Sequence, residues 1–423
     1  MQDRRKRVRS KQGALPALAA YRQDVAGRPL DVRSSARVGS WLAVASLLEH
    51  AGRLAPDERT ATANAIDSLL QEVLSAPLLS QGPSLDPPGE QTDTTGRAIR
   101  TLAEEMEEAG ALRLAHSMLG AYVAAGFAGT ALDEGRCVAL RARTAWKLGH
   151  LDESQLRYKA VDRLGRIHKL PELRVRAWVG FAILARIRGN YPDSRRWASR
   201  AAAAADRYGL RALAGVAVHT QLVGAAVAGD FDAALVFGWR GFCDALGDPT
   251  REAEMLVTLA QLLLDIGRPQ LALRGFAAAL DRQPIPRFLY PALGGAAVAA
   301  AQLHLGELVS RYATWLEDAA RPGVLPYDYA SAQLDVARAL AFAGNHDDAE
   351  TWRARAQATG VELGFHAIVH HASILAEQER SLRRHASEVP ENPALRHRVL
   401  SPDALEVLDA VGALSVSADA VTV

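Results

Sequence analysis

The sequence predicts an all-α protein built from stacked helical hairpins, and three observations support this fold class. Aromatic residues make up only 6% of the 423 residues, which favours helices over strands. Alanine, the strongest helix former, is abundant. A glycine recurs at spacings of 38–40 residues, the last interval covering two periods: Gly110, Gly149, Gly189, Gly229, Gly267 and Gly344. A fixed period of this kind is typical of repeat architectures.

Each glycine has the same surroundings. A glycine after a helix supplies the left-handed backbone conformation that ends it, and an Asp or Asn just beyond can cap the next helix. Five residues after the glycine a small side chain recurs: Ala115, Ser154, Ser194, Ala234, Ala272 and Ala349. Seven residues before it small or apolar side chains recur: Ala103, Ala142, Ala182, Leu222, Ala260 and Ala337. We therefore expect two helices that approach closely on either side of each glycine.

The period places an array of about six or seven hairpins over residues 96–360. The expected helix pairs are 96–109/111–126, 132–148/151–167, 171–188/192–208, 211–228/231–246, 250–266/269–282, 289–305/308–320 and 328–343/346–360. The unit around Gly306 has Arg311 where a small residue is expected, so we expect that repeat to be degenerate or broken.

The flanks have a different composition. Residues 1–31 begin with a basic, apolar-poor run and are expected to form a disordered tail. Residues 32–76 form an N-terminal helical pair, 32–53 and 57–76, and residues 77–95 form a linker rich in Pro and Gly. Residues 361–423 are expected to hold capping helices, over 362–386 and 402–414, and a frayed tail.

The pattern resembles the tetratricopeptide repeat, a helix–turn–helix unit, over about residues 96–358. The resemblance lies in the small residues around the turn glycine and in the aromatic positions held by Trp178, Tyr158 and Phe276. The period of 38–40 residues departs from the usual value of about 34, so the resemblance implies a long-period variant. It also implies an α-α superhelix, with the first helix of every unit lining a concave groove.

Composition and motifs exclude several classes of protein. The 49 Lys and Arg balance 48 Asp and Glu, which excludes a globally basic nucleic-acid coat. The phosphate-binding, metalloprotease and hydrolase motifs are absent, and His366 and His370 lack further ligands, so we expect neither an enzyme nor a metal or cofactor. Cys137 and Cys243 stand outside any cluster, which favours a reducing compartment. We expect a cytoplasmic protein without a membrane span, whose uncharged stretches 212–229 and 288–306 are buried helices.

By the resemblance, ligand side chains come from fixed positions before each turn glycine. Those we select are Arg136, Arg143, Trp146, Lys147, Arg176, Arg186, His219 and Gln261. The guanidinium group of arginine can donate two parallel hydrogen bonds to one carboxylate. The resemblance therefore implies a groove for an acidic or carboxylate-ended peptide. The Asn positions of the known two-carboxylate clamp are absent. An equally weighted alternative is that these arginines pair with acids on neighbouring helices.

Two functional hypotheses follow. The first is a non-enzymatic scaffold or adaptor that binds a peptide or protein segment in the groove. The second is a regulatory sensor, similar to the helical-repeat portions of bacterial transcription regulators that bind signalling peptides or small ligands. No DNA-binding pattern is visible, and the basic residues within 4–11 favour a solubilising terminus over a nucleic-acid arm. The partner and the oligomeric state stay open, as does whether residues 1–95 pack on the array.

Overall fold

The computed structural model describes residues 32–54, 62, 64–66, 68–70, 94–108, 111–320, 325–363, 365–384 and 400–416. Within these ranges every regular element is a helix and no strand occurs, so the predicted all-α solenoid is confirmed. The chain divides into two compact units, and the division falls between Arg157 and Tyr158, inside a helix. The expected tail over 1–31 and most of the expected linker over 77–95 lie outside the described residues.

Unit 1 joins the N-terminal helix to the first part of the array. Its helices are α2 (Val32–Ala51), α4 (Thr94–Glu108), α5 (Leu112–Ala124), α6 (Ala131–Lys147) and the first part of α7 (Leu151–Ile167). Helix α5 packs against α2, α4 and α6. Trp41 and Leu48 of α2 are buried, as are Leu102 and Met106 of α4. The first helix of the N-terminal pair therefore shares a core with the array. The described residues of its second helix are also helical.

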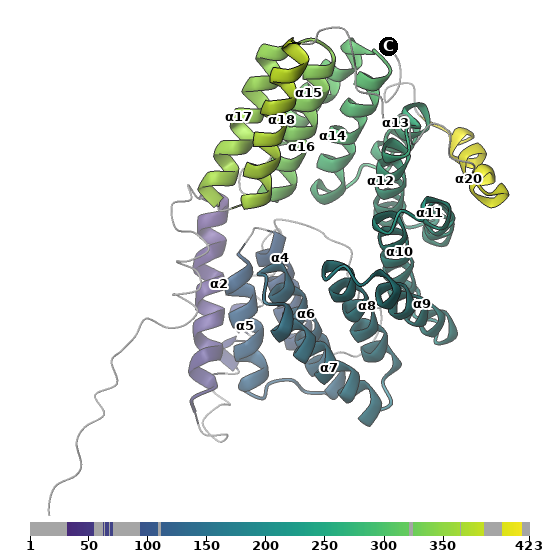
Figure 1. Ribbon diagram of the computed structural model, residues 1–423. Helices are drawn as coiled ribbons and strands as arrows, with labels where there is room; N and C mark the ends of the chain where they lie inside the picture. The colour runs from purple at the N-terminus through teal and green to yellow at the C-terminus, as the bar shows by residue number, and fades with distance from the viewer. Residues whose placement is uncertain are drawn as a thin grey trace, which may run out of the picture. The chain divides into compact units, whose positions relative to one another are not determined.

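Unit 2 is a row of helical hairpins (Figure 1). After the end of α7 come α8 (Pro171–Ile187), α9 (Tyr191–Arg207), α10 (Arg211–Val227), α11 (Phe231–Ala245), α12 (Pro249–Asp265), α13 (Pro269–Leu280), α14 (Pro286–Gln302), α15 (Gly306–Ala319), α16 (Pro326–Phe342) and α17 (His346–Leu363). Each of these helices packs against the next one, and each first helix from α8 to α14 also contacts the following first helix. The even-numbered helices α8 to α16 thus form one continuous first-helix face.

Backbone geometry at the turns explains the glycine repeat. Gly149 has φ +84°, and the next amide, of His150, donates to the Ala145 carbonyl at 2.9 Å, which closes the helix end. The connections between hairpins use the same device, because Lys169 has φ 55° and Gly209 has φ 65°. Left-handed residues therefore follow each other at 20-residue intervals: Gly149, Lys169, Gly189, Gly209 and Gly229. The underlying repeat is one helix and one turn.

The repeat around Gly306 is not broken, although it departs from the glycine pattern of the other units. Helices α14 and α15 form a complete hairpin, in which the left-handed turn residue is His304, with φ 61°. Gly306 is instead the first residue of α15. Counting five residues from His304 reaches Val309, which is fully buried, whereas Arg311 is exposed. The repeat register of this unit therefore counts from His304 and not from Gly306.

Small residues allow neighbouring helices to approach closely, as the repeat pattern predicts. Ser154 is fully buried, and its hydroxyl donates to the Ala142 carbonyl of α6 at 2.8 Å. A Cβ atom added to Gly295 of α14 would lie 2.2 Å from Cζ of Phe276 on α13. The aromatic ring therefore occupies the space above the glycine. This packing agrees with the prediction that the stretch 288–306 is a buried helix.

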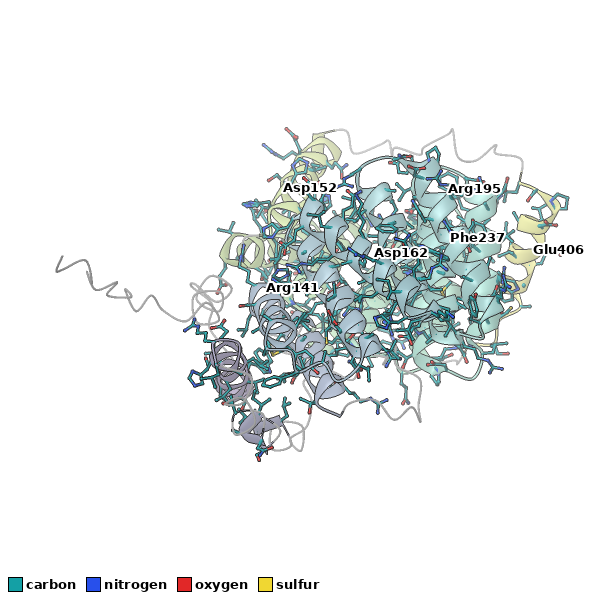
Figure 2. All side chains as sticks on the ribbon, turned by 90° about the horizontal axis from the view of Figure 1, so that it is seen from below. Arg141, Asp152, Asp162, Arg195, Phe237 and Glu406 are labelled. Atoms are coloured by element: carbon teal, nitrogen blue, oxygen red, sulfur yellow. The ribbon has the colours of Figure 1, made fainter. Side chains whose placement is uncertain are left out.

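The C-terminal helices take two different positions. Helix α18 (His366–Arg384) packs against α16 and α17, at the end of the hairpin row, as expected for a capping helix. Helix α20 (Pro402–Gly412) does not continue this cap but packs against α11 and α13. Glu406 of α20 and Phe237 of α11 mark this edge of unit 2 in Figure 2.

Polar bonds hold both ends of the segment that contains α20. The Ser401 amide donates to Oδ1 of Asp232 at 3.3 Å, and Nε of Arg274 donates to the Leu414 carbonyl at 2.8 Å. Between these ends, Val411 of α20 is fully buried. Burial of an apolar face is the main driving force for such a short helix to dock.

We expect Val411→Asp to detach α20, because a carboxylate at a fully buried position loses its hydration without gaining a partner. Hydrogen exchange should show lost protection of the α20 amides, while α14–α17 stay protected. Leu405→Asp is the matched control, since Leu405 lies on the same helix and is 48% exposed. Equal protection in both variants would show that α20 docks without its apolar face.

Candidate functional site

Two of the predicted ligand residues of unit 1 are engaged in an internal ion-pair cluster. Nη2 of Arg143 donates to Oε2 of Glu107 at 2.8 Å and to Oε1 of Glu104 at 3.2 Å. The ammonium group of Lys147 donates to the other oxygen of Glu107. Glu104 and Glu107 belong to α4, whereas Arg143 and Lys147 belong to α6. For these two cations the structure shows the alternative interpretation, pairing with acids on a neighbouring helix.

The other two predicted residues of unit 1 differ in their exposure. Arg136 is 1% exposed, so the expectation that its guanidinium lies on the surface is wrong. Its position on α6 faces the core, as do its neighbours Cys137 and Val138. Trp146 is half-buried, and its indole Nε1 is buried without a hydrogen-bond partner among the described residues.

In unit 2, two predicted residues also bind within the chain. Nε of Arg176 donates to Oε1 of Glu172, one turn earlier on α8, at 2.8 Å, and both side chains are largely buried. The Gln261 amide donates to Oδ1 of Asp265 on α12 at 3.3 Å. Neither contact rules out a ligand, but each uses polar groups that a ligand would otherwise bind.

The remaining two predicted residues, Arg186 and His219, belong to a polar cluster on the first-helix face. We call it the first-helix site and define it as Arg186 of α8, His219 of α10, Arg251 and Glu254 of α12, and Arg287 of α14. His219 Nε2 lies 3.1 Å from the Thr258 hydroxyl, and its Nδ1 lies 3.9 Å from Oε1 of Glu254. Nη1 of Arg251 donates to Oε2 of Glu254 at 2.7 Å.

The first-helix site carries an excess of positive charge. Burial lowers the pKa of His219; Glu254 opposes this shift, and the charges of Arg287, Arg251 and Arg186 reinforce it. His219 is therefore neutral at pH 7. Arg251 is paired with Glu254, but Arg186 and Arg287 have no ion-pair partner in the part of the chain that the structure describes. Two unpaired guanidinium groups thus act on one partly buried imidazole.

Sequence reasoning missed Arg251 and Arg287. Arg287 lies in the first turn of α14, and the expected helix there began at residue 289, so no groove position was assigned to it. Pro286 was the available signal, because proline is favoured at the first position of a helix. Arg251 lies in the first turn of α12, three residues before Glu254, outside the groove positions counted from Gly267.

Apolar side chains accompany these charges on the same helices. Ile187, at the C-terminal end of α8, is 40% exposed, and Val227, at the C-terminal end of α10, is 49% exposed.

Among the described residues no group of three or more His, Cys, Asp or Glu side chains could hold a metal ion. None of the described helices combines the length and the apolar character that crossing a bilayer requires.

Comparisons with known proteins place few limits on this chain. No family model matches the sequence, and no curated protein matches it. Among solved structures, the chain is similar to a Signal Transduction ATPase with Numerous Domains (STAND) protein with a tetratricopeptide repeat sensor from Pyrococcus horikoshii. That similarity has a TM-score of 0.48 at 10% sequence identity and covers 87% of this chain but 56% of the other.

Proposed function

We propose that this chain is a non-enzymatic interaction module that binds an acidic or carboxylate-ended peptide or protein segment on the first-helix face of unit 2. The observation that carries this proposal is the pair of arginines, Arg186 and Arg287, whose charges act on His219 and which have no carboxylate partner among the described residues. Charge-assisted hydrogen bonds from arginine forks are the strong polar interactions of such sites. A carboxylate of the ligand would supply the missing negative charge.

The peptide character of the ligand rests on the apolar surface beside these charges. Ile187 and Val227 are exposed large side chains at the ends of the helices that carry Arg186 and His219. Peptide-binding surfaces combine polar anchors with apolar positions for alternate side chains. The proposal therefore assigns the ligand contacts to Arg186, His219 and Arg287. It leaves Arg143, Lys147 and Arg176 to their internal ion pairs.

Two further properties belong to the same proposal. We place the protein in the cytoplasm, because Cys243 is a free and exposed cysteine, which suits a reducing compartment. The long-period tetratricopeptide-like assignment stays a prediction, as does the regulatory-sensor hypothesis. The scaffold and the regulatory sensor would both bind their ligand on the first-helix face.

We expect Arg186→Gln together with Arg287→Gln to weaken peptide binding at least about tenfold, because two charge-assisted contacts would be lost. The assay is retention of peptides from a library with free C-terminal carboxylates, compared with the same library amidated. Wild-type protein should prefer peptides with a free or side-chain carboxylate.

Arg240→Gln is the matched control for that assay, since Arg240 is an exposed arginine of α11 that pairs with Asp206. It should retain the wild-type selection. If the double variant selects the same peptides with the same affinity as wild type, the first-helix site is not the binding surface.

A further inference from the structure

Positive charge is concentrated in one stretch of unit 2. Residues 158–211 contain 13 Lys and Arg but only 4 Asp and Glu, although the whole chain has 49 and 48. The stretch comprises the end of α7, all of α8 and α9, and the first residue of α10. The rest of the chain therefore has a net negative charge. The near-zero net charge of the whole chain is an average that includes this strongly basic segment.

Within this segment arginine and tryptophan side chains stack alternately. The guanidinium carbon of Arg174 lies 4.8 Å, and that of Arg200 4.2 Å, from the ring centroid of Trp178. Arg200 and Arg196 each lie 5.5 Å from the Trp197 ring centroid. We call these five residues the arginine–tryptophan strip. Cation–π contacts of this kind hold a guanidinium in place without neutralising its charge.

The strip rests on a rigid support. The Phe181 ring packs edge-on against Tyr158 at a centroid distance of 6.3 Å, and it contacts the Trp197 ring at 5.2 Å. Tyr158 and Phe181 thus connect Trp197 of the strip to α7 and α8. Figure 2 labels Asp162 of α7 and Arg195 of α9, the helix that carries Trp197. The cationic groups are thus preorganised by a packed core.

The acidic side chains of the segment leave much of this charge unbalanced. Each of the four acids is already paired with an arginine: Asp162 with Arg166, Glu172 with Arg176, Asp193 with Arg196, and Asp206 with Arg240. Several exposed cations have no ion-pair partner in the described part of the chain, namely Lys159, Arg163, Lys169, Arg200 and Arg207. These exposed cations are therefore available to an external polyanion.

We propose that this basic surface of α7–α9 binds single-stranded nucleic acid through its sugar–phosphate backbone. A strand carries one phosphate per nucleotide, which matches a surface with several unpaired cations better than a single carboxylate does. Arginine planes supported on aromatic rings are also platforms on which unstacked bases can lie, and such stacking tolerates any base. Arg200, exposed on one side and resting on Trp178 on the other, is the central residue of this platform.

This inference is independent of the proposed function, because it concerns other residues. The peptide site uses Arg186, His219 and Arg287, whereas the nucleic-acid surface uses Arg163, Arg200 and Arg207 with the lysines of α7 and its turn. The two proposals can therefore fail separately.

The test measures fluorescence anisotropy of labelled 20-nucleotide oligo(U) and oligo(dT) with the full chain across a range of salt concentrations. We expect binding of both strands, with log K falling linearly against log salt at roughly 0.7 per phosphate contacted. Arg163→Gln, Arg200→Gln and Arg207→Gln combined should weaken binding at least about tenfold and flatten the slope by about 2. Arg311→Gln, at an exposed position of α15 outside the segment, should leave it unchanged.

Two further arms distinguish other polyanions. Tighter binding of a 20-base-pair duplex, or equal competition by poly-glutamate at matched charge, would overturn the assignment to single strands. Absence of oligonucleotide binding at low salt would overturn the proposal entirely. If the triple variant does not fold, Lys159→Gln with Arg163→Gln provides the comparison, since it leaves both tryptophan stacks intact.

Discussion

Replacement of Gly295 by alanine should lower the free energy of unfolding by about 2–3 kcal/mol, near the upper end of what an added methyl group costs in a packed core. The new Cβ would lie 2.2 Å from Cζ of Phe276 and 2.7 Å from Cε1. Phe276 is fully buried between helices, so its ring cannot turn toward solvent to make room. Urea unfolding at pH 7 measures the difference directly.

Gly306→Ala is the matched control. Nothing lies within 4 Å of a Cβ added there, and Gly306 is also a helical residue, the first of α15. It should be neutral or slightly stabilising, since alanine is the better helix former. A double-mutant cycle with Phe276→Leu isolates the clash: the smaller side chain should reduce the cost of the alanine. An equal cost in both backgrounds would show that the ring and the glycine are not in contact.

The helix boundaries were predictable because one residue type carries the signal. At Gly149 and Gly189 the left-handed backbone, with φ +84° and +75°, strongly favours glycine, and the sequence displays it. The signal is missing at two of the alternate turns, because Lys169 and Gln283 adopt φ 55° and 49° without being glycine. At these two positions the residue type does not reveal the left-handed backbone, which is uncommon for residues other than glycine.

The candidate site was only partly predictable for a similar reason. Counting back from the turn glycines identified Arg186 and His219, because helical periodicity decides which positions share a face. It could not show that Arg143 and Lys147 are paired, since their partner Glu107 lies on another helix, 36 residues before Arg143 and 40 before Lys147. Nor could it place α20, whose contacts with α11 and α13 join segments more than 120 residues apart.

Net charge was the least informative of the sequence observations. A formal charge of +1 argued against a nucleic-acid partner, yet it is an average over a basic segment, 158–211, and acidic surroundings. Electrostatic attraction between exposed charges falls off within about 10 Å at moderate salt. A ligand therefore responds to the local surface of α7–α9 and not to the total.

Glu107→Gln should destabilise the protein by about 2–3 kcal/mol at pH 7, because it removes the charge that neutralises Arg143 and Lys147. Burial alone raises the pKa of Glu107, but the charges and hydrogen bonds of Arg143 and Lys147 outweigh it and lower the pKa to about 2. A carboxyl whose pKa is lower in the folded state stabilises that state whenever it is ionised.

This stabilisation has a definite pH window. It is fully present above the ordinary pKa of 4.5 and is lost as the pH falls toward about 2, so the difference between wild type and Glu107→Gln should shrink from pH 7 to pH 3. Glu104→Gln is the control, because Glu104 bonds the same Arg143 but is 37% exposed, and an exposed ion pair contributes less than about 1 kcal/mol. A loss at Glu107 that is equal at both pH values would arise from packing, and the ion pair would then not stabilise unit 1.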